Sequence, residues 1–156
     1  YYLESAVSLD PRHAQAHLNA GLLYAETGRH GDAVKAFQTS YGLDPGPVAA
    51  YNLAVLLSGS DPGTSLEYAR VASGSKPENP KYVYLYAFYL MQNGQSAEAT
   101  GVLEGAVGRG SVSFDIYYLL GSVYRNLGFE EKLRKLYLKA KKDMRLSADE
   151  RRVFSE

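Results

Sequence analysis

The chain contains no cysteine among its 156 residues, which excludes disulfides, thiolate nucleophiles and cysteine-ligated metals in this sequence. This absence is compatible with the cytoplasm and with the periplasm, so it assigns no compartment. The chain also carries no excess of charge, because 17 Lys and Arg balance 17 Asp and Glu, and we therefore expect no nucleic-acid partner. The longest apolar run, Tyr82 to Met91, is half of the ~20 residues that a membrane helix needs.

The composition is otherwise that of a folded protein, with 46% hydrophobic residues and an unusually large number of tyrosines, 14. The first residue is Tyr1, not Met, and the opening residues resemble the middle of a helix. We therefore expect the sequence to be a fragment or an excised domain.

A repeat of about 34 residues runs through the sequence. Small residues recur at spacings of 33, 33 and 34 at Gly21, Ala54, Ala87 and Gly121. Three of the four units have a glycine seven residues later, at Gly28, Gly94 and Gly128. Apolar residues within each unit follow steps of three and four, which predicts two amphipathic helices joined by a glycine turn. Each unit is therefore predicted to be a helical hairpin, and hairpins must stack to bury their apolar faces.

The expected helices cover 1–9, 14–27, 30–43, 47–59, 62–74, 80–93, 96–108, 113–127 and 130–144. A short last helix, about 148–155, is predicted from Ser147 and Glu150, which have the spacing of a capping box.

The repeated residues resemble the tetratricopeptide repeat (TPR) family, in a bacterial-type domain. The first full unit matches its pattern at Gly21, Tyr24, Gly28, Ala33, Phe37 and Pro45. The resemblance implies an all-α fold, a right-handed α-solenoid of helix–turn–helix repeats with a C-terminal capping helix. By the same resemblance, we expect Val153 and Phe154 of that helix to cover the last apolar face of the array. We expect one TPR domain over 1–156, with a partial repeat at 1–13, repeats at about 14–46, 47–79, 80–113 and 114–146, and the capping helix at about 148–155.

The resemblance also implies a concave groove lined by the first helix of each repeat. The residues at its groove positions are Leu18, Asn19, Leu22, Tyr51, Asn52, Val55, Tyr84, Phe88, Met91, Tyr118, Ser122 and Arg125. Tyrosine offers a rigid apolar face with one hydroxyl, and asparagine can pair with the backbone of an extended peptide. The alternative is that these tyrosines pack against neighbouring helices and expose only an edge.

The expected function is a non-catalytic scaffold that binds an extended segment of a protein or peptide in this groove. The alternatives are a self-associating structural domain that forms a homo-oligomer through the N-terminal half-repeat, and a regulatory TPR tail of a larger enzyme or multihaem cytochrome. A clamp for the acidic C-termini of heat-shock chaperones is not expected. Asn52 and Lys81 match its pattern, but Leu18, Leu22 and Leu85 occupy its other three positions.

No pattern of catalytic, cofactor-binding or metal-binding residues emerges, so we predict no enzyme activity, no cofactor and no metal site. His13 and His17 have a spacing that can hold zinc, but no third ligand accompanies them. The glycine-containing stretch 59–65 lacks the lysine of a phosphate-binding loop, and we interpret it as a turn with Pro62 opening a helix.

Charge is uneven along the chain despite the neutral total. Residues 125–152 contain ten Lys and Arg and five Asp and Glu. This basic C-terminal end could contact an acidic partner, or it could be the solvated outer face of the last helices.

Overall fold

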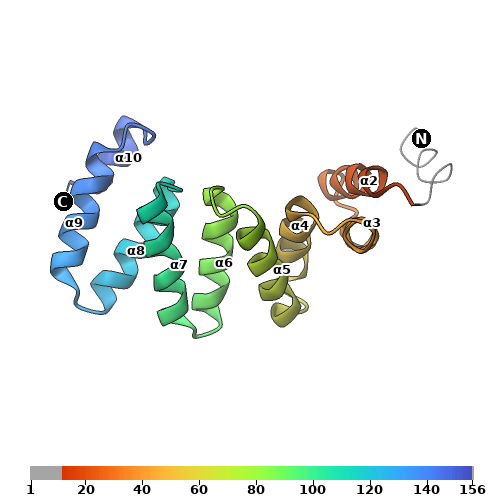
Figure 1. Cartoon of the computed structure of the whole chain (residues 1–156), viewed down its shortest axis with the longest axis horizontal. Coiled ribbons are helices and arrows are strands. Elements are labelled where there is room, and N and C mark those ends of the chain that lie inside the picture. Colours follow the sequence, from red (N-terminus) through yellow and green to blue (C-terminus); the bar gives the residue numbers. More distant parts are fainter. Residues whose placement is uncertain (1–11, 156) are drawn as a thin grey trace. The chain divides into compact units, whose positions relative to one another are not determined.

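The computed structural model describes residues 12–155, and within them every regular element is a helix. The helices are α2 (Ala14–Glu26), α3 (His30–Leu43), α4 (Pro47–Leu57), α5 (Pro62–Ser75), α6 (Pro80–Gln92), α7 (Ser96–Arg109), α8 (Phe114–Asn126), α9 (Glu130–Lys142) and α10 (Ala148–Val153) (Figure 1). The predicted all-α class is confirmed, and the predicted helices in this range agree with these bounds to within two residues. The helix expected at 1–9, and with it the proposed half-repeat, lies outside the described residues.

The chain divides between Lys76 and Pro77 into two compact units. In the first unit α2 packs on α3, α3 on α4 and α4 on α5. In the second unit α6 packs on α7, α7 on α8, α8 on α9 and α9 on α10, and α6 also contacts α8. Figure 1 shows the helices of each unit following one another as hairpins.

Three of the hairpins turn at the glycines that the repeat pattern singled out. Gly28, Gly94 and Gly128 have φ angles of 75°, 76° and 69°, in the left-handed region where a side chain is strained. Each ends the first helix of its hairpin, because the next backbone N–H returns to a carbonyl of the last turn, as from Arg29 to Tyr24 at 2.8 Å. The α4–α5 hairpin turns differently, since the Asp61 side chain accepts from the Thr64 N–H and Pro62 opens α5.

The small residues of the repeat lie where the two helices of a hairpin approach closely. A Cβ at Gly21 would lie 2.7 Å from the ring of Phe37, and a Cβ at Gly121 would lie 2.8 Å from the ring of Tyr137. In the α4–α5 hairpin the buried Ser65 hydroxyl donates to the Ala54 carbonyl at 2.6 Å. Close contact between the helices explains why only small residues occur at these positions.

The short helix α10 closes the end of the second unit. Ser147 and Glu150 form the predicted capping box. The Phe154 side chain is 3% exposed, and its ring lies 5.2 Å from that of Tyr137 and 5.6 Å from that of Phe114. Val153 is 49% exposed, so its predicted role in covering the apolar face is wrong, whereas the prediction for Phe154 agrees with its burial. Successive residues of a helix lie about 100° apart around its axis, so Val153 faces solvent while Phe154 packs inward.

Candidate protein-binding surface

Helix α2 carries three of the predicted groove residues in the first unit. Leu18 is half-buried and packs against the core cluster that contains Phe37, so it serves the interior as well as the surface. Asn19 is exposed, and its side-chain oxygen accepts from the Gln15 amide at 2.9 Å. Leu22 is exposed. The two outward-facing residues of α2 are therefore Asn19 and the apolar Leu22. The side-chain oxygen of Asn19 takes part in this hydrogen bond, and its amide N–H groups do not.

Helix α4 carries the next three predicted residues. Tyr51 is half-buried, Asn52 is half-buried and Val55 is exposed. The Asn52 Nδ2 donates to the Val48 carbonyl of its own helix at 2.8 Å. This bond fixes the rotamer of the amide and leaves its oxygen as the group that would meet an incoming N–H.

Helix α6 presents a stacked aromatic pair in the second unit. Tyr84 and Phe88, one turn apart, have ring centroids 5.9 Å apart and an interplanar angle of 19°. Burial raises the pKa of Tyr84, and the charge of Asp115 on the adjoining α8 raises it further. Met91, one turn beyond Phe88, is half-buried. The pair forms a rigid apolar face whose hydroxyl stays protonated at neutral pH.

Helix α8 presents a second stacked pair. Tyr118 is 51% exposed, and its ring lies 5.7 Å from that of Phe114 at an interplanar angle of 22°. Sequence reasoning missed Phe114, although an aromatic residue four positions before Tyr118 signals this contact. Ser122 is bound to its own helix, because its hydroxyl donates to the Tyr118 carbonyl at 3.0 Å. Because α6 and α8 are in contact, we name Tyr84, Phe88, Phe114 and Tyr118 the α6–α8 aromatic surface.

Arg125, the last of the predicted groove residues, lies in a different setting from this surface. Its guanidinium donates to the Tyr137 hydroxyl at 2.9 Å. Together with Tyr137, Leu138 and Phe154 it lines a pocket formed by α8, α9 and the end of the chain. The structure therefore joins Arg125 to the C-terminal end of the second unit.

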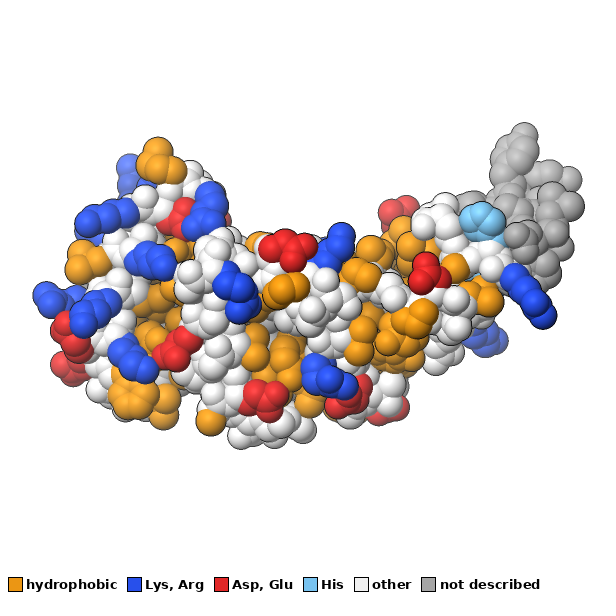
Figure 2. Space-filling model, viewed as in Figure 1, with side chains coloured by type: hydrophobic (Ala, Val, Ile, Leu, Met, Phe, Trp, Pro, Cys, Tyr) orange, Lys and Arg blue, Asp and Glu red, His pale blue; other side chains and the backbone are white. Residues whose placement is uncertain are grey.

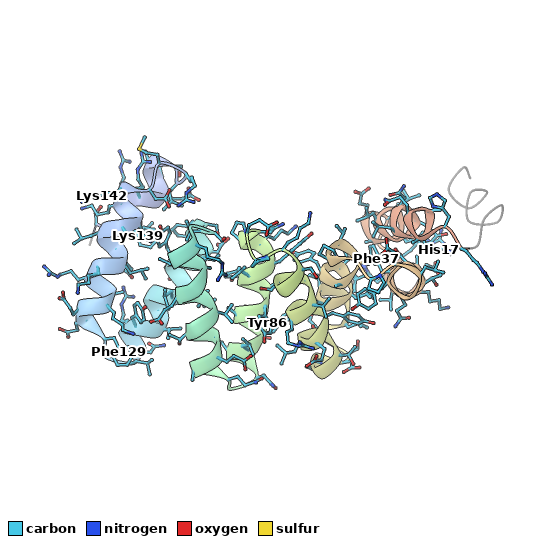
Figure 3. All side chains as sticks on the ribbon, in the orientation of Figure 1. His17, Phe37, Tyr86, Phe129, Lys139 and Lys142 are labelled. Carbon is cyan, nitrogen blue, oxygen red and sulfur yellow. The ribbon has the colours of Figure 1, made fainter. Side chains whose placement is uncertain are left out.

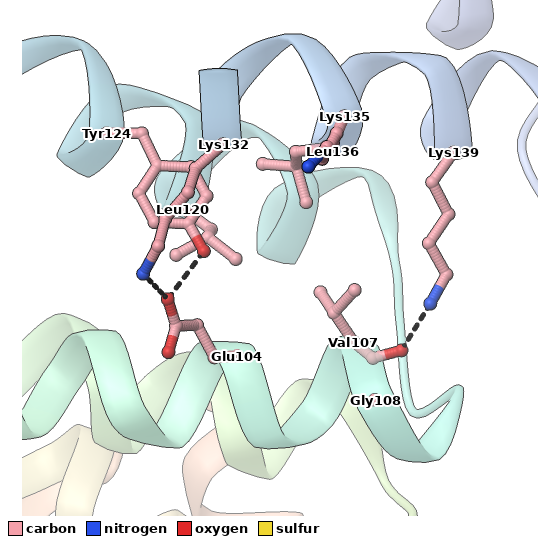
Figure 4. Close-up of a pocket in the computed structure, with 9 residues that line it drawn as sticks. All are labelled: Glu104, Val107, Gly108, Leu120, Tyr124, Lys132, Lys135, Leu136 and Lys139. Carbon is pink, nitrogen blue, oxygen red and sulfur yellow. Dashed lines mark hydrogen bonds and ion pairs between the residues drawn. The ribbon is translucent and has the colours of Figure 1, made fainter. Parts of the chain in front are cut away.

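A separate pocket of about 330 Å³ lies between α7, α8 and α9, and sequence reasoning did not predict it (Figure 4). The Tyr124 hydroxyl and the Lys132 ammonium both donate to Oε1 of Glu104, at 2.7 and 3.0 Å. These bonds hold the pKa of Glu104 below its ordinary value, while burial and the bond to Glu104 raise the pKa of Tyr124. No sequence signal joins these residues, because Glu104 and Lys132 are 28 positions apart.

The two histidines that have the spacing of zinc ligands, His13 and His17, lie at the start of α2. His13 is the N-cap of α2, and its Nδ1 accepts from the Ala16 N–H at 3.1 Å. His17 follows in the same helix and is half-buried (Figure 3). Among residues 12–155 no group of three or more His, Asp or Glu side chains is arranged to hold a metal ion. In the same range no helix has the length and apolar character to cross a membrane.

A model of the tetratricopeptide repeat family matches residues 2–48 of the chain. A comparison with curated proteins gives no match. Among solved structures, MamA superposes with a TM-score of 0.75 at 18% identity, covering 88% of this chain and 81% of MamA. YrrB, described as a TPR protein with an unusual peptide-binding site, superposes with a TM-score of 0.77 at 16% identity, covering 99% of this chain and 82% of YrrB. PilF of Pseudomonas aeruginosa superposes with a TM-score of 0.73 at 17% identity, covering 98% of this chain and 70% of PilF.

At these identities the three structures show a shared fold, whereas the family match rests on the sequence itself. The TPR fold is in general a scaffold for protein–protein interaction, and its repeats imply protein or peptide partners. The match over residues 2–48, together with the helical hairpins that continue to the end of the described chain, supports a domain of the tetratricopeptide repeat type.

Proposed function

We propose that residues 1–156 act as one non-catalytic TPR domain that binds an extended protein segment along the first helices of its repeats. The observation that carries this proposal is the α6–α8 aromatic surface, where two stacked ring pairs lie on adjacent helices and Tyr118 is half exposed. Rigid aromatic side chains of this kind bind partner side chains at low entropic cost.

The asparagines of the first unit suit the backbone of such a segment. Asn19 accepts a hydrogen bond within its helix, so its N–H groups are the ones directed at a partner carbonyl. Asn52 donates within its helix, so its oxygen is the group directed at a partner N–H. Opposite roles in successive repeats would match the alternating donors and acceptors of an extended backbone.

The test begins with a phage-displayed library of random peptides selected on the immobilised chain. The selected peptide is then titrated by fluorescence anisotropy against wild type, Phe88→Ala and Tyr118→Ala. We expect each substitution to weaken binding at least fivefold, because truncation of an aromatic residue at the centre of a binding site costs more than about 1 kcal/mol.

Phe129→Ala provides the matched control, since Phe129 is also an exposed aromatic residue of the second unit but lies at the α8–α9 turn (Figure 3). Circular dichroism checks that each variant is folded. A selected peptide that binds Phe88→Ala and Tyr118→Ala as tightly as Phe129→Ala would contradict the proposal.

A further inference from the structure

The pocket between α7 and α9 has one wall made of lysines. Lys132, Lys135 and Lys139 follow one another at steps of three and four along α9, so their side chains lie on one face of that helix. Glu104 is the single acidic residue that lines the pocket, and the lining therefore has two more positive than negative charges. Figure 2 shows Lys and Arg side chains gathered over this end of the second unit.

The floor of the pocket is apolar. Leu120 and Leu136 contribute side chains that the fold has almost fully removed from water, and Val107 forms the facing edge on α7. A volume of about 330 Å³ is near the lower end of the range for ligand pockets. It suffices for one or two apolar side chains of a partner, and not for a large cofactor.

The three lysines keep binding capacity for an acidic partner. Lys132 is paired with Glu104, and Lys135 lies 3.4 Å from Glu131 but is 71% exposed. Lys139 donates to the Val107 carbonyl at 2.8 Å, a neutral partner that carries no charge to offset that of the ammonium (Figure 4). Each ammonium has three donors, and each of these contacts uses one.

We propose that this pocket is a second docking site, which binds an acidic segment of a partner protein. One apolar side chain of the segment inserts between Leu120, Leu136 and Val107, and the flanking carboxylates pair with Lys135 and Lys139. The complementary charge selects the acidic partner, and the apolar floor adds the requirement for a hydrophobic residue within it. This site lies between α7 and α9, whereas the proposed peptide surface lies on the first helices of the repeats. An experiment can therefore contradict one of the two proposals without contradicting the other.

The probe is a fluorescein-labelled peptide of sequence EELFEELEE, titrated against the whole chain at moderate salt. Two control peptides separate the requirements: QQLFQQLQQ lacks the carboxylates and EESSEESEE lacks the apolar residues. We expect each control to bind at least fivefold more weakly than the probe. Equal binding of the probe and EESSEESEE would overturn the proposal, because charge alone would then account for it.

Variants locate the site on the chain. Lys135→Gln combined with Lys139→Gln is expected to weaken binding of the probe at least fivefold. The matched control, Lys141→Gln combined with Lys142→Gln, removes the same charge from the same helix outside the pocket, and its effect is expected to be under twofold. Circular dichroism checks the fold of both. Equal losses in the two pairs would overturn the proposal and indicate diffuse attraction to a basic end, as would tighter binding of phosphatidylserine vesicles than of the probe.

Discussion

At the scale of single residues, the close approach of α2 and α3 depends on Gly21. A methyl group there would meet the fully buried ring of Phe37, which has no room to withdraw. We expect Gly21→Ala to destabilise the chain by about 1–3 kcal/mol, because overpacking outweighs the helix-forming advantage of alanine. Chemical denaturation followed by circular dichroism measures the change.

Gly42→Ala is the matched control for this prediction. Gly42 lies in α3 with open space around its Cα, so alanine there should stabilise the helix by up to about 1 kcal/mol. If Gly21→Ala and Gly42→Ala changed the free energy of unfolding equally, close contact between the helices would not explain the small residue at position 21.

The sequence predicts the structural roles of some individual residues and not of others. Gly21 and the turn glycine Gly28 follow from the repeat pattern, because each is required by local geometry or by contact within one hairpin. The repeat position of Arg125 predicts a place in the groove, and this stays a prediction, but it does not predict the hydrogen bond from the guanidinium to the Tyr137 hydroxyl on the following helix. The direction of a long, flexible side chain depends on its tertiary neighbours, which a repeat pattern does not specify.

At the scale of elements, the loop between α9 and α10 is held by Asp143. Its carboxylate accepts from the Arg145 guanidinium at 2.6 and 2.8 Å and from the Tyr117 hydroxyl of α8 at 3.0 Å. The hydrogen bonds from Arg145 lower the pKa of Asp143 to about 2. A carboxylate with a lowered folded-state pKa contributes stability that is present above its unfolded pKa of ~3.9.

We therefore expect the chain to lose about 1–2 kcal/mol of unfolding free energy between pH 4 and pH 2, after allowance for screening by solvent. Urea denaturation at a series of pH values measures this loss. Asp143→Asn should be less stable at pH 7 and should show a flatter profile below pH 4. Asp149→Asn is the control, because Asp149 is an exposed partner of Arg152 in α10. A wild-type profile in Asp143→Asn would show that another carboxylate causes the acid sensitivity.

The elements themselves were predictable because each helix has local start and stop signals, such as Pro62 after Asp61 and the box of Ser147 with Glu150. The α7–α9 pocket was not, because it requires Glu104 and Lys132 to meet across two hairpins. The sequence predicts only a basic C-terminal end. The structure resolves part of that end into a face of lysines over an apolar floor.

At the scale of the whole molecule, the main packing contacts in each unit join helices that are neighbours or near neighbours in sequence. Stability in such proteins is approximately a sum of repeat and nearest-neighbour contributions, so damage at one end need not spread to the other. Phe154 is a suitable position for a destabilising substitution at one end, because its buried ring contacts Phe114, Tyr117 and Tyr137. Truncation of a buried phenylalanine costs about 3–5 kcal/mol.

We expect Phe154→Ala to raise amide hydrogen exchange in α8, α9 and α10 at least tenfold, while exchange in α2 and α3 stays within twofold of wild type. Hydrogen-exchange mass spectrometry on peptides from each helix measures both regions in one sample. Val153→Ala is the matched control, since the exposed neighbouring side chain should leave every helix unchanged. A uniform rise across both units in Phe154→Ala would mean that the chain unfolds as a single cooperative block, and the additive description of its repeats would then be wrong.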